Sequence, residues 1–121
     1  MSFFSAFKRP ADPYTLSAAE FQTRLQPGEP VLDVRTPAEY ADGHLAETIL
    51  VDVMASDFNQ RIEALLAEGA LVKEQPVYLY CRSGNRSGTA ARRLREMGFS
   101  EAYNVGGFNA LAKAGLPTTH G

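Results

Sequence analysis

The chain has 121 residues, of which 45% are hydrophobic and 21% are charged, as is typical of one soluble globular domain. Its net charge of −2 argues against nucleic acid as a partner, because a phosphate backbone attracts a basic surface. No apolar stretch approaches the roughly 20 residues of a membrane-spanning helix, and one cysteine with two histidines excludes an internal disulfide and a thiolate metal cluster.

The first 13 residues are predicted to be an N-terminal arm, and residues 14–121 a single domain. Three phenylalanines of the arm, Phe3, Phe4 and Phe7, are compatible either with docking on the domain or with a contact between two molecules. An export signal would need a basic region before its apolar stretch and a small-residue cleavage site after it, and this segment has neither. We therefore expect a cytoplasmic protein, either monomeric or dimeric.

Short apolar runs alternate with segments of helical periodicity along the rest of the chain, a pattern that predicts an α/β fold with a parallel sheet. In chain order we expect a brief edge strand at 14–16, a helix between 17 and 27, a strand at 31–34, a short helix between 36 and 43, a strand at 49–53, a helix between 58 and 69, a strand at 77–80, a helix at 87–97, a strand at 102–105 and a short helix at 108–114.

Capping boxes indicate where the first two helices begin. In this motif a Ser or Thr accepts a hydrogen bond from the backbone three residues later, and a Glu at that position bonds back to the cap. Ser17 with Glu20 fits the motif, and so does Thr36 with Glu39, where Pro37 adds the favoured residue at the first helical position. Glu39 thus has a structural role that needs no further partner.

The loop at residues 81–86 lies between a buried strand and a helix. Ligands of open parallel sheets bind beyond the carboxyl ends of the strands, which is where this loop falls. The backbone N–H groups of such a loop can converge into an anion-binding nest, and the start of the next helix adds the positive end of its dipole. Gly84 permits the backbone angles of a tight curl.

A thiol inside this nest is expected to have a pKa below the ordinary value of about 8.5, because the dipoles and the nearby Arg charge stabilise its anion. An ionised Cys81 would act as a nucleophile without a separate base, and the same field would stabilise a persulfide anion. The alternative is an inert buried cysteine at a strand end. The Gly, Ser, Asn and two Arg that follow within five residues favour the nucleophile.

The segment YCRSGNRS at residues 80–87 resembles the active-site loop of rhodanese-homology domains, the thiosulfate sulfurtransferase family. Two further parts of the chain, one before this loop and one after it, resemble the first and closing segments of the family. They are LDVR at 32–35, EY at 39–40 and GHL at 43–45, then NVGGF at 104–108 and GLP at 115–117. The resemblance spans about residues 14–118, with all motifs in order.

The resemblance implies an α/β fold with a five-stranded parallel sheet flanked by helices on both faces. It also implies a reaction without a cofactor, in which Cys81 takes a sulfane sulfur from a small anionic donor and passes it to a thiol or cyanide-type acceptor. Arg82 and Arg86 would hold the donor, and Asp33 and Arg35 would brace the loop. The backbone that would cradle the sulfur belongs to Arg82, Ser83, Gly84, Asn85 and Arg86.

Several of these roles have alternatives. Asp33 can instead bond to its own turn, and Arg35 can pair with Glu39. His44 is interpreted as a hydrogen-bonding support and not as a general base. The chain also departs from the family pattern, which commonly has Gly-Ala at Glu47-Thr48 and a Trp at residue 108, where this chain has Phe.

Two other functions compete with sulfur transfer. Cysteine phosphatases and arsenate reductases use a thiolate in an anion nest, but with Arg at the sixth position after Cys, where this chain has Ser87. The shorter spacing to Arg86 suits a single sulfur atom better than an oxyanion. The second alternative is an interaction module or a sulfur relay to a protein partner. A helical face with Arg92, Arg93 and Arg95 would then be the docking surface, although these side chains can also be simply a solvated face of the helix.

Overall fold

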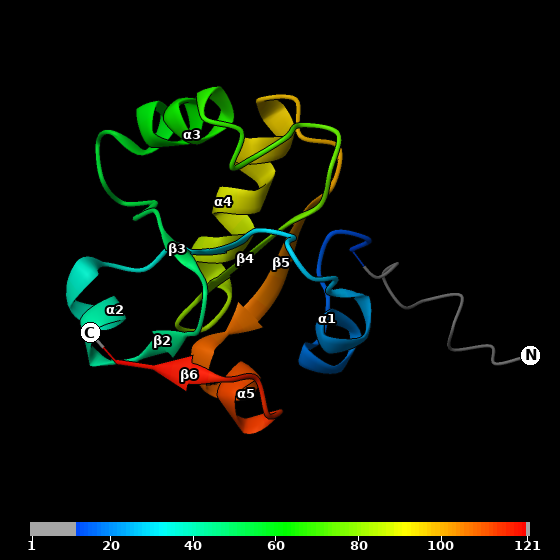
Figure 1. Cartoon of the computed structure of the whole chain (residues 1–121), viewed down its shortest axis with the longest axis vertical. Helices are drawn as coiled ribbons and strands as arrows, with labels where there is room; N and C mark the ends of the chain where they lie inside the picture. The colour runs from blue at the N-terminus through cyan, green and yellow to red at the C-terminus, as the bar shows by residue number, and fades with distance from the viewer. Residues whose placement is uncertain (1–11, 121) are drawn as a thin grey trace, which may run out of the picture.

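The computed structural model describes residues 12–120, so the Phe residues of the predicted arm lie outside the described part of the chain. A parallel sheet with the strand order β3-β1-β4-β5 forms the centre of the domain (Figure 1). Its strands are β1 (Val31–Asp33), β3 (Ile49–Leu50), β4 (Val77–Cys81) and β5 (Ala102–Gly107).

The prediction of a fifth strand in this sheet is wrong. Thr15 forms only an isolated parallel bridge with Asn104 beside β5. Asp12 holds the preceding turn by accepting bonds from the Tyr14 backbone and the Thr15 hydroxyl, and the capping box at Ser17 begins a helix two residues later. The segment between the turn and the helix is therefore too short to extend the ladder.

Five helices complete the described fold, and both predicted capping boxes form. The helices are α1 (Ala18–Arg24), α2 (Pro37–Asp42), α3 (Phe58–Ala67), α4 (Asn85–Glu96) and α5 (Phe108–Lys113). The last long helix, α4, begins at Asn85, two residues earlier than predicted, and this places its N-terminus directly against the loop after β4. None of the helices in residues 12–120 is long and apolar enough to cross a bilayer.

The sheet has a hydrophobic core on each face, and β4 contributes to both. Val77, Leu79 and Cys81 face the core that includes residues of α3 and α4, whereas Tyr78 and Tyr80 face the core that includes residues of α1 and α5. This alternation follows from the two-residue period of a strand. Helices therefore cover both faces, as the resemblance implied, and all five residues of β4 are buried.

A small antiparallel ribbon lies beside the main sheet and was not predicted. It pairs β2 (His44–Leu45) with β6 (Thr118–Thr119), which brings the end of the chain against the segment after α2 (Figure 1). Two-residue strands have no period that a sequence pattern can reveal. The predicted strand at 49–53 was too long, since the regular ladder includes Ile49 and Leu50, and beyond them Val51 and Val53 add single backbone bonds to Asp33 and Val34.

Candidate active site

The loop after β4 surrounds the sulfur of Cys81 with hydrogen-bond donors. The backbone N–H of Gly84 donates to Sγ over 3.0 Å, and the hydroxyl of Ser87 lies 3.3 Å from Sγ. Gly84 has a φ of 98°, which lets the loop curl back onto the thiol, and α4 begins at the next residue. The sulfur thus lies where backbone dipoles and a helix N-terminus converge.

Two opposing effects act on the ionisation of Cys81. Burial raises the pKa of the thiol, because an anion is poorly solvated inside the protein. The hydrogen bonds from the Ser87 hydroxyl and from the backbone of Ser87, Ser83 and Gly84 lower the pKa, and together they outweigh burial. The net pKa is below its ordinary value, so the nest stabilises the thiolate.

The Cys81 side chain is 0% exposed to solvent in this conformation. Its loop neighbours Arg82, Ser83 and Asn85 are exposed, so the buried sulfur lies next to the protein surface. A reagent can reach Sγ only after the Cys81 side chain rotates or the loop shifts. The described conformation is therefore a closed form of the site.

Strand β5 supports the inner side of the loop. A Cβ atom added at Gly107 would lie 2.5 Å from the carbonyl oxygen of Arg82, so only glycine allows this approach. The Asn104 side-chain Nδ2 donates to the Gly84 carbonyl over 3.0 Å, and its Oδ1 accepts from the Gly106 N–H over 3.0 Å. These contacts hold the loop against the sheet.

Asn104 also contacts Ser87, a role that sequence reasoning missed. The Ser87 oxygen lies 2.7 Å from Asn104 Oδ1 and 3.3 Å from Cys81 Sγ. One hydroxyl proton therefore has two acceptors. Asn104 belongs to the closing segment of the resemblance, but no local pattern connects it to a residue 17 positions earlier.

A buried group of polar side chains lies behind the loop. The Asp33 carboxylate accepts bonds from Arg35 Nε (2.9 Å) and Nη2 (2.7 Å), and the Tyr80 hydroxyl donates to it over 2.6 Å. Arg35 Nη2 also donates to the Gly43 carbonyl over 2.7 Å. The group joins β1 to β4 and to the end of α2.

Within the described residues, neither Asp33 nor Arg35 donates to or accepts from the loop at 82–86. Asp33 is connected to the site through Tyr80, which precedes Cys81 in β4. Arg35 also lines the small pocket beside the loop, together with Arg82. Asp33 also accepts from the backbone N–H of Arg35, so it bonds to its own turn. The alternative pairing of Arg35 with Glu39 does not form, because Arg35 pairs with Asp33.

Glu39 pairs instead with Arg86 of the loop. Two hydrogen bonds, of 2.8 and 2.9 Å, join the guanidinium to the two carboxylate oxygens. The Arg86 hydrogen bond is the main cause that lowers the pKa of Glu39 to about 2. Arg82 is exposed and forms no ion pair with another residue of the described range.

His44 has a supporting position. Its ring stacks on Tyr40 with a centroid separation of 3.5 Å, and Nδ1 lies 2.7 Å from the Tyr40 carbonyl oxygen. The side chain is buried between α2 and β6. These contacts agree with the hydrogen-bonding role and give His44 no contact with Cys81.

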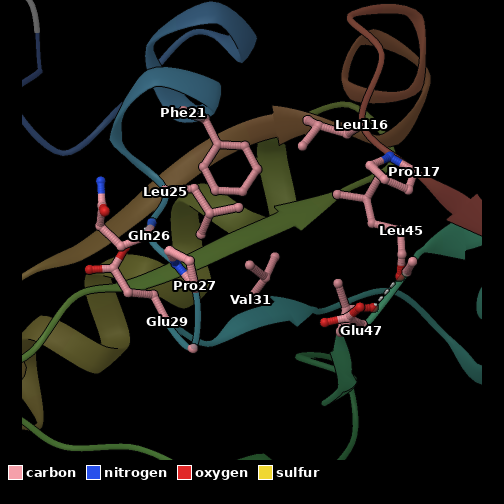
Figure 2. Close-up of a pocket in the computed structure, with 13 residues that line it drawn as sticks. Phe21, Leu25, Gln26, Pro27, Glu29, Val31, Leu45, Glu47, Leu116 and Pro117 are labelled. Atoms are coloured by element: carbon pink, nitrogen blue, oxygen red, sulfur yellow. Dashed lines mark hydrogen bonds between the residues drawn. The ribbon is translucent and has the colours of Figure 1, made fainter.

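Two pockets differ in their relation to the loop. A cavity of about 380 Å³ lies between α1 and the segments at 45–48 and 116–117, and Figure 2 shows Leu25, Val31 and Leu45 facing it. No residue of the 81–87 loop lines this apolar cavity, so its size does not make it the reaction site. A smaller pocket of about 180 Å³ lies beside the loop, and its lining includes Arg82, Glu39, Asp42 and Phe108.

A comparison with protein families agrees with this arrangement. The family model described as "Rhodanese-like domain" matches residues 17–114. The chain belongs to the rhodanese family. Within residues 12–120 of this rhodanese-like domain, no group of three or more His, Cys, Asp and Glu side chains is placed to bind a metal ion.

Two thiosulfate sulfurtransferases and one solved structure match the domain over about nine tenths of their length. It is 34% identical over 111 residues to "Thiosulfate sulfurtransferase 16, chloroplastic" of Arabidopsis thaliana, covering 88% of this chain and 92% of that protein. It is 30% identical over 114 residues to "Thiosulfate sulfurtransferase GlpE" of Ectopseudomonas mendocina, covering 94% and 92%. The crystal structure of the Alr3790 protein from Anabaena sp. superposes with a TM-score of 0.71 at 28% identity, covering 87% and 91%.

Proposed function

We propose that this chain is a sulfurtransferase that carries a sulfane sulfur as a persulfide on Cys81. The observation that carries the proposal is the donor nest around Sγ, in which the Gly84 N–H and the Ser87 hydroxyl favour the thiolate over the thiol. Relatives of matching length are named thiosulfate sulfurtransferases, which supports the same chemistry.

The reaction has two nucleophilic steps. The Cys81 thiolate attacks the outer sulfur of an anionic donor such as thiosulfate; a new S–S bond forms, the donor's S–S bond breaks, and sulfite leaves with the electron pair. The terminal sulfur of Cys–S–S⁻ is then attacked by a thiolate or cyanide, which restores the Cys81 thiolate. Charge and electrons balance without a cofactor or an external oxidant.

The loop provides the groups that this reaction needs. Exposed Arg82 attracts the anionic donor, and the backbone N–H groups of residues 82–86 hold the terminal sulfur. Because Sγ is covered in the closed form, loading requires a rotation of the Cys81 side chain or a displacement of the loop. Asp33 and Arg35 act as supports through Tyr80.

The competing functions fit the contacts less well. Cysteine phosphatases have Arg at the sixth position after Cys, where this chain has Ser87, and Arg86 one position earlier is paired with Glu39. Two of the three Arg side chains proposed as a docking face on α4 already contact the domain itself. Arg95 packs 4.1 Å above the Tyr14 ring and donates to the Ala102 carbonyl, and Arg93 lies over the Phe58 ring. Sulfur relay to a protein acceptor remains compatible with the second step.

Intact mass measurement tests the proposal. Incubation with thiosulfate is expected to add one sulfur atom, cyanide should remove it, and Cys81→Ser should gain nothing. An aryl phosphate assayed in parallel separates the phosphatase alternative. Phosphate release by a protein that accepts no sulfur would overturn the proposal.

A further inference from the structure

Arg82, Arg86 and Glu39 all lie at the mouth of the loop, and Asp42 lines the same small pocket as Arg82 and Glu39. Arg82 and Arg86 are both positive, but the bidentate pair with Glu39 cancels the charge of Arg86. Both members of the pair are mostly shielded, with side-chain exposures of 26% for Arg86 and 21% for Glu39. A donor that approaches the site therefore meets one unpaired cation instead of two.

The position of Glu39 is fixed independently of Arg86. Its Oε1 accepts from the Thr36 N–H over 3.0 Å and from the Thr36 hydroxyl over 3.1 Å, as part of the capping box of α2. The carboxylate is thus held in place before it meets the guanidinium. Little side-chain entropy is lost when the pair forms, so the pair persists in the closed site.

Arg86 is also close enough to the nucleophile for their charges to interact. The pKa of Arg86 is raised, first by the hydrogen bond to Glu39 and to a smaller degree by the charges of Cys81 and Asp52. A change in the pairing of Arg86 therefore changes the electrostatic potential where the anionic donor reacts.

We propose that Glu39 is a specificity-determining residue, which makes the site favour sulfur donors with one negative charge over the thiosulfate dianion. This inference rests on the proposed sulfur transfer. The attraction between a donor and a fixed charge is proportional to the donor's charge. Cancelling one cation therefore reduces the binding free energy of a dianion by twice as much as that of a monoanion.

The variant Glu39→Gln tests the charge alone. Glutamine also occupies the third position of a capping box, so α2 keeps its cap while Arg86 becomes an unpaired cation. Thiosulfate and methanethiosulfonate are suitable donors, because both deliver their outer sulfur but differ by one charge. They release sulfite and methanesulfinate respectively, and cyanide serves as the common acceptor.

The expected result is a KM for thiosulfate lower by about tenfold in the variant, and a KM for methanethiosulfonate lower by about threefold, the square root of that factor. Glu20→Gln is the matched control, since Glu20 has the same position in the capping box of α1 but no contact with Arg86. It should leave both KM values unchanged. Thermal melting of both variants checks the fold.

Arg86→Gln gives a second readout with the opposite sign. It leaves the Glu39 carboxylate unpaired at the mouth, so the KM for thiosulfate should rise more than that for methanethiosulfonate. The double variant Glu39→Gln/Arg86→Gln should return the ratio of the two KM values towards that of the unmodified protein. This reversal would not follow from a merely structural role of the pair.

The outcomes separate this inference from the proposed function. If the unmodified protein accepts sulfur from neither donor, the proposed function fails. If it accepts sulfur from both but Glu39→Gln changes the two KM values by the same factor, or changes neither, the role of Glu39 is overturned and sulfur transfer stands.

Discussion

At the scale of single residues, the Ser87 hydroxyl controls the charge of Cys81 most directly. It is the strongest of the hydrogen bonds that lower the thiol pKa, and Asn104 competes for the same proton. When Cys81 is ionised, the hydroxyl donates to Sγ; when the thiol is protonated, it can donate to Asn104. The serine therefore adjusts to both states of the sulfur.

We predict that Ser87→Ala raises the pKa of Cys81, because the thiolate loses a donor while its burial is unchanged. The loss of one hydrogen bond of about 1 kcal/mol should slow alkylation by iodoacetamide by roughly fivefold at pH values well below the midpoint of the profile. The pH profile of alkylation measures the change. Ser100→Ala, on the surface, is the control, and an unaltered profile in Ser87→Ala would contradict the assignment.

Glu47 is a second residue with a local consequence. It has a φ of 61°, the left-handed conformation that glycine adopts without a steric penalty, and it stands where the family commonly has Gly. We expect Glu47→Gly to raise the free energy of unfolding by about 1 kcal/mol, as measured by urea denaturation. The control Glu63→Gly, inside α3, should lower the free energy of unfolding by a similar amount. If Glu47→Gly also lowered it, the backbone at Glu47 would not be strained.

At the scale of elements, the Asp33 carboxylate connects β1, β4 and the end of α2. Asp33→Asn would leave the buried Arg35 guanidinium without a counter-charge, which typically costs about 3–5 kcal/mol of folding stability. Urea denaturation measures this loss. Glu101→Gln, which affects the exposed pair with Arg24, should change stability by less than about 1 kcal/mol. Equal losses in the two variants would mean that the buried pair stabilises the fold no more than the exposed one.

The pair between α2 and α4 makes stability depend on pH. Arg86, together with the hydrogen bonds from Thr36, lowers the pKa of Glu39 from 4.5 to about 2, so folding favours the ionised form. The resulting stabilisation is complete above about 4.5 and is lost as the pH falls towards 2. Glu39→Gln has no ionisable group at this position. The difference in unfolding free energy between the unmodified protein and this variant should therefore be constant near neutral pH and shrink below 4.5. A deficit that does not change with pH would rule out the ion pair as its cause.

These elements differ in how well the sequence predicts them. Both capping boxes were predicted because their partners are three residues apart, and β4 was predicted because a strand buried on both faces is uniformly apolar. The contact of Glu39 with Arg86 spans 47 residues, and that of Asn104 with Gly84 spans 20. Such contacts depend on the register of the folded sheet, which no local pattern contains.

At the scale of the whole molecule, the sheet places the loop at the carboxyl end of its central strand, where Cys81 is buried while Arg82, Ser83 and Asn85 stay exposed. Cys81 is the last residue of β4, and Gly107 of β5 approaches the loop so closely that a larger residue would not fit. The sequence predicted that Cys81 lies at the carboxyl end of this strand. It did not predict that the sulfur would be fully covered, because coverage depends on how β5 and α4 pack around the loop.

We infer that this nest lowers the pKa of Cys81 and that the loop opens to expose the thiol. Because the chain has one cysteine, the pH dependence of iodoacetamide alkylation of the native protein reports on Cys81 alone. The account predicts complete alkylation, with a midpoint below the value of about 8.5 for an ordinary thiol. A midpoint at or above that value, or a thiol that reacts only after unfolding, would contradict it.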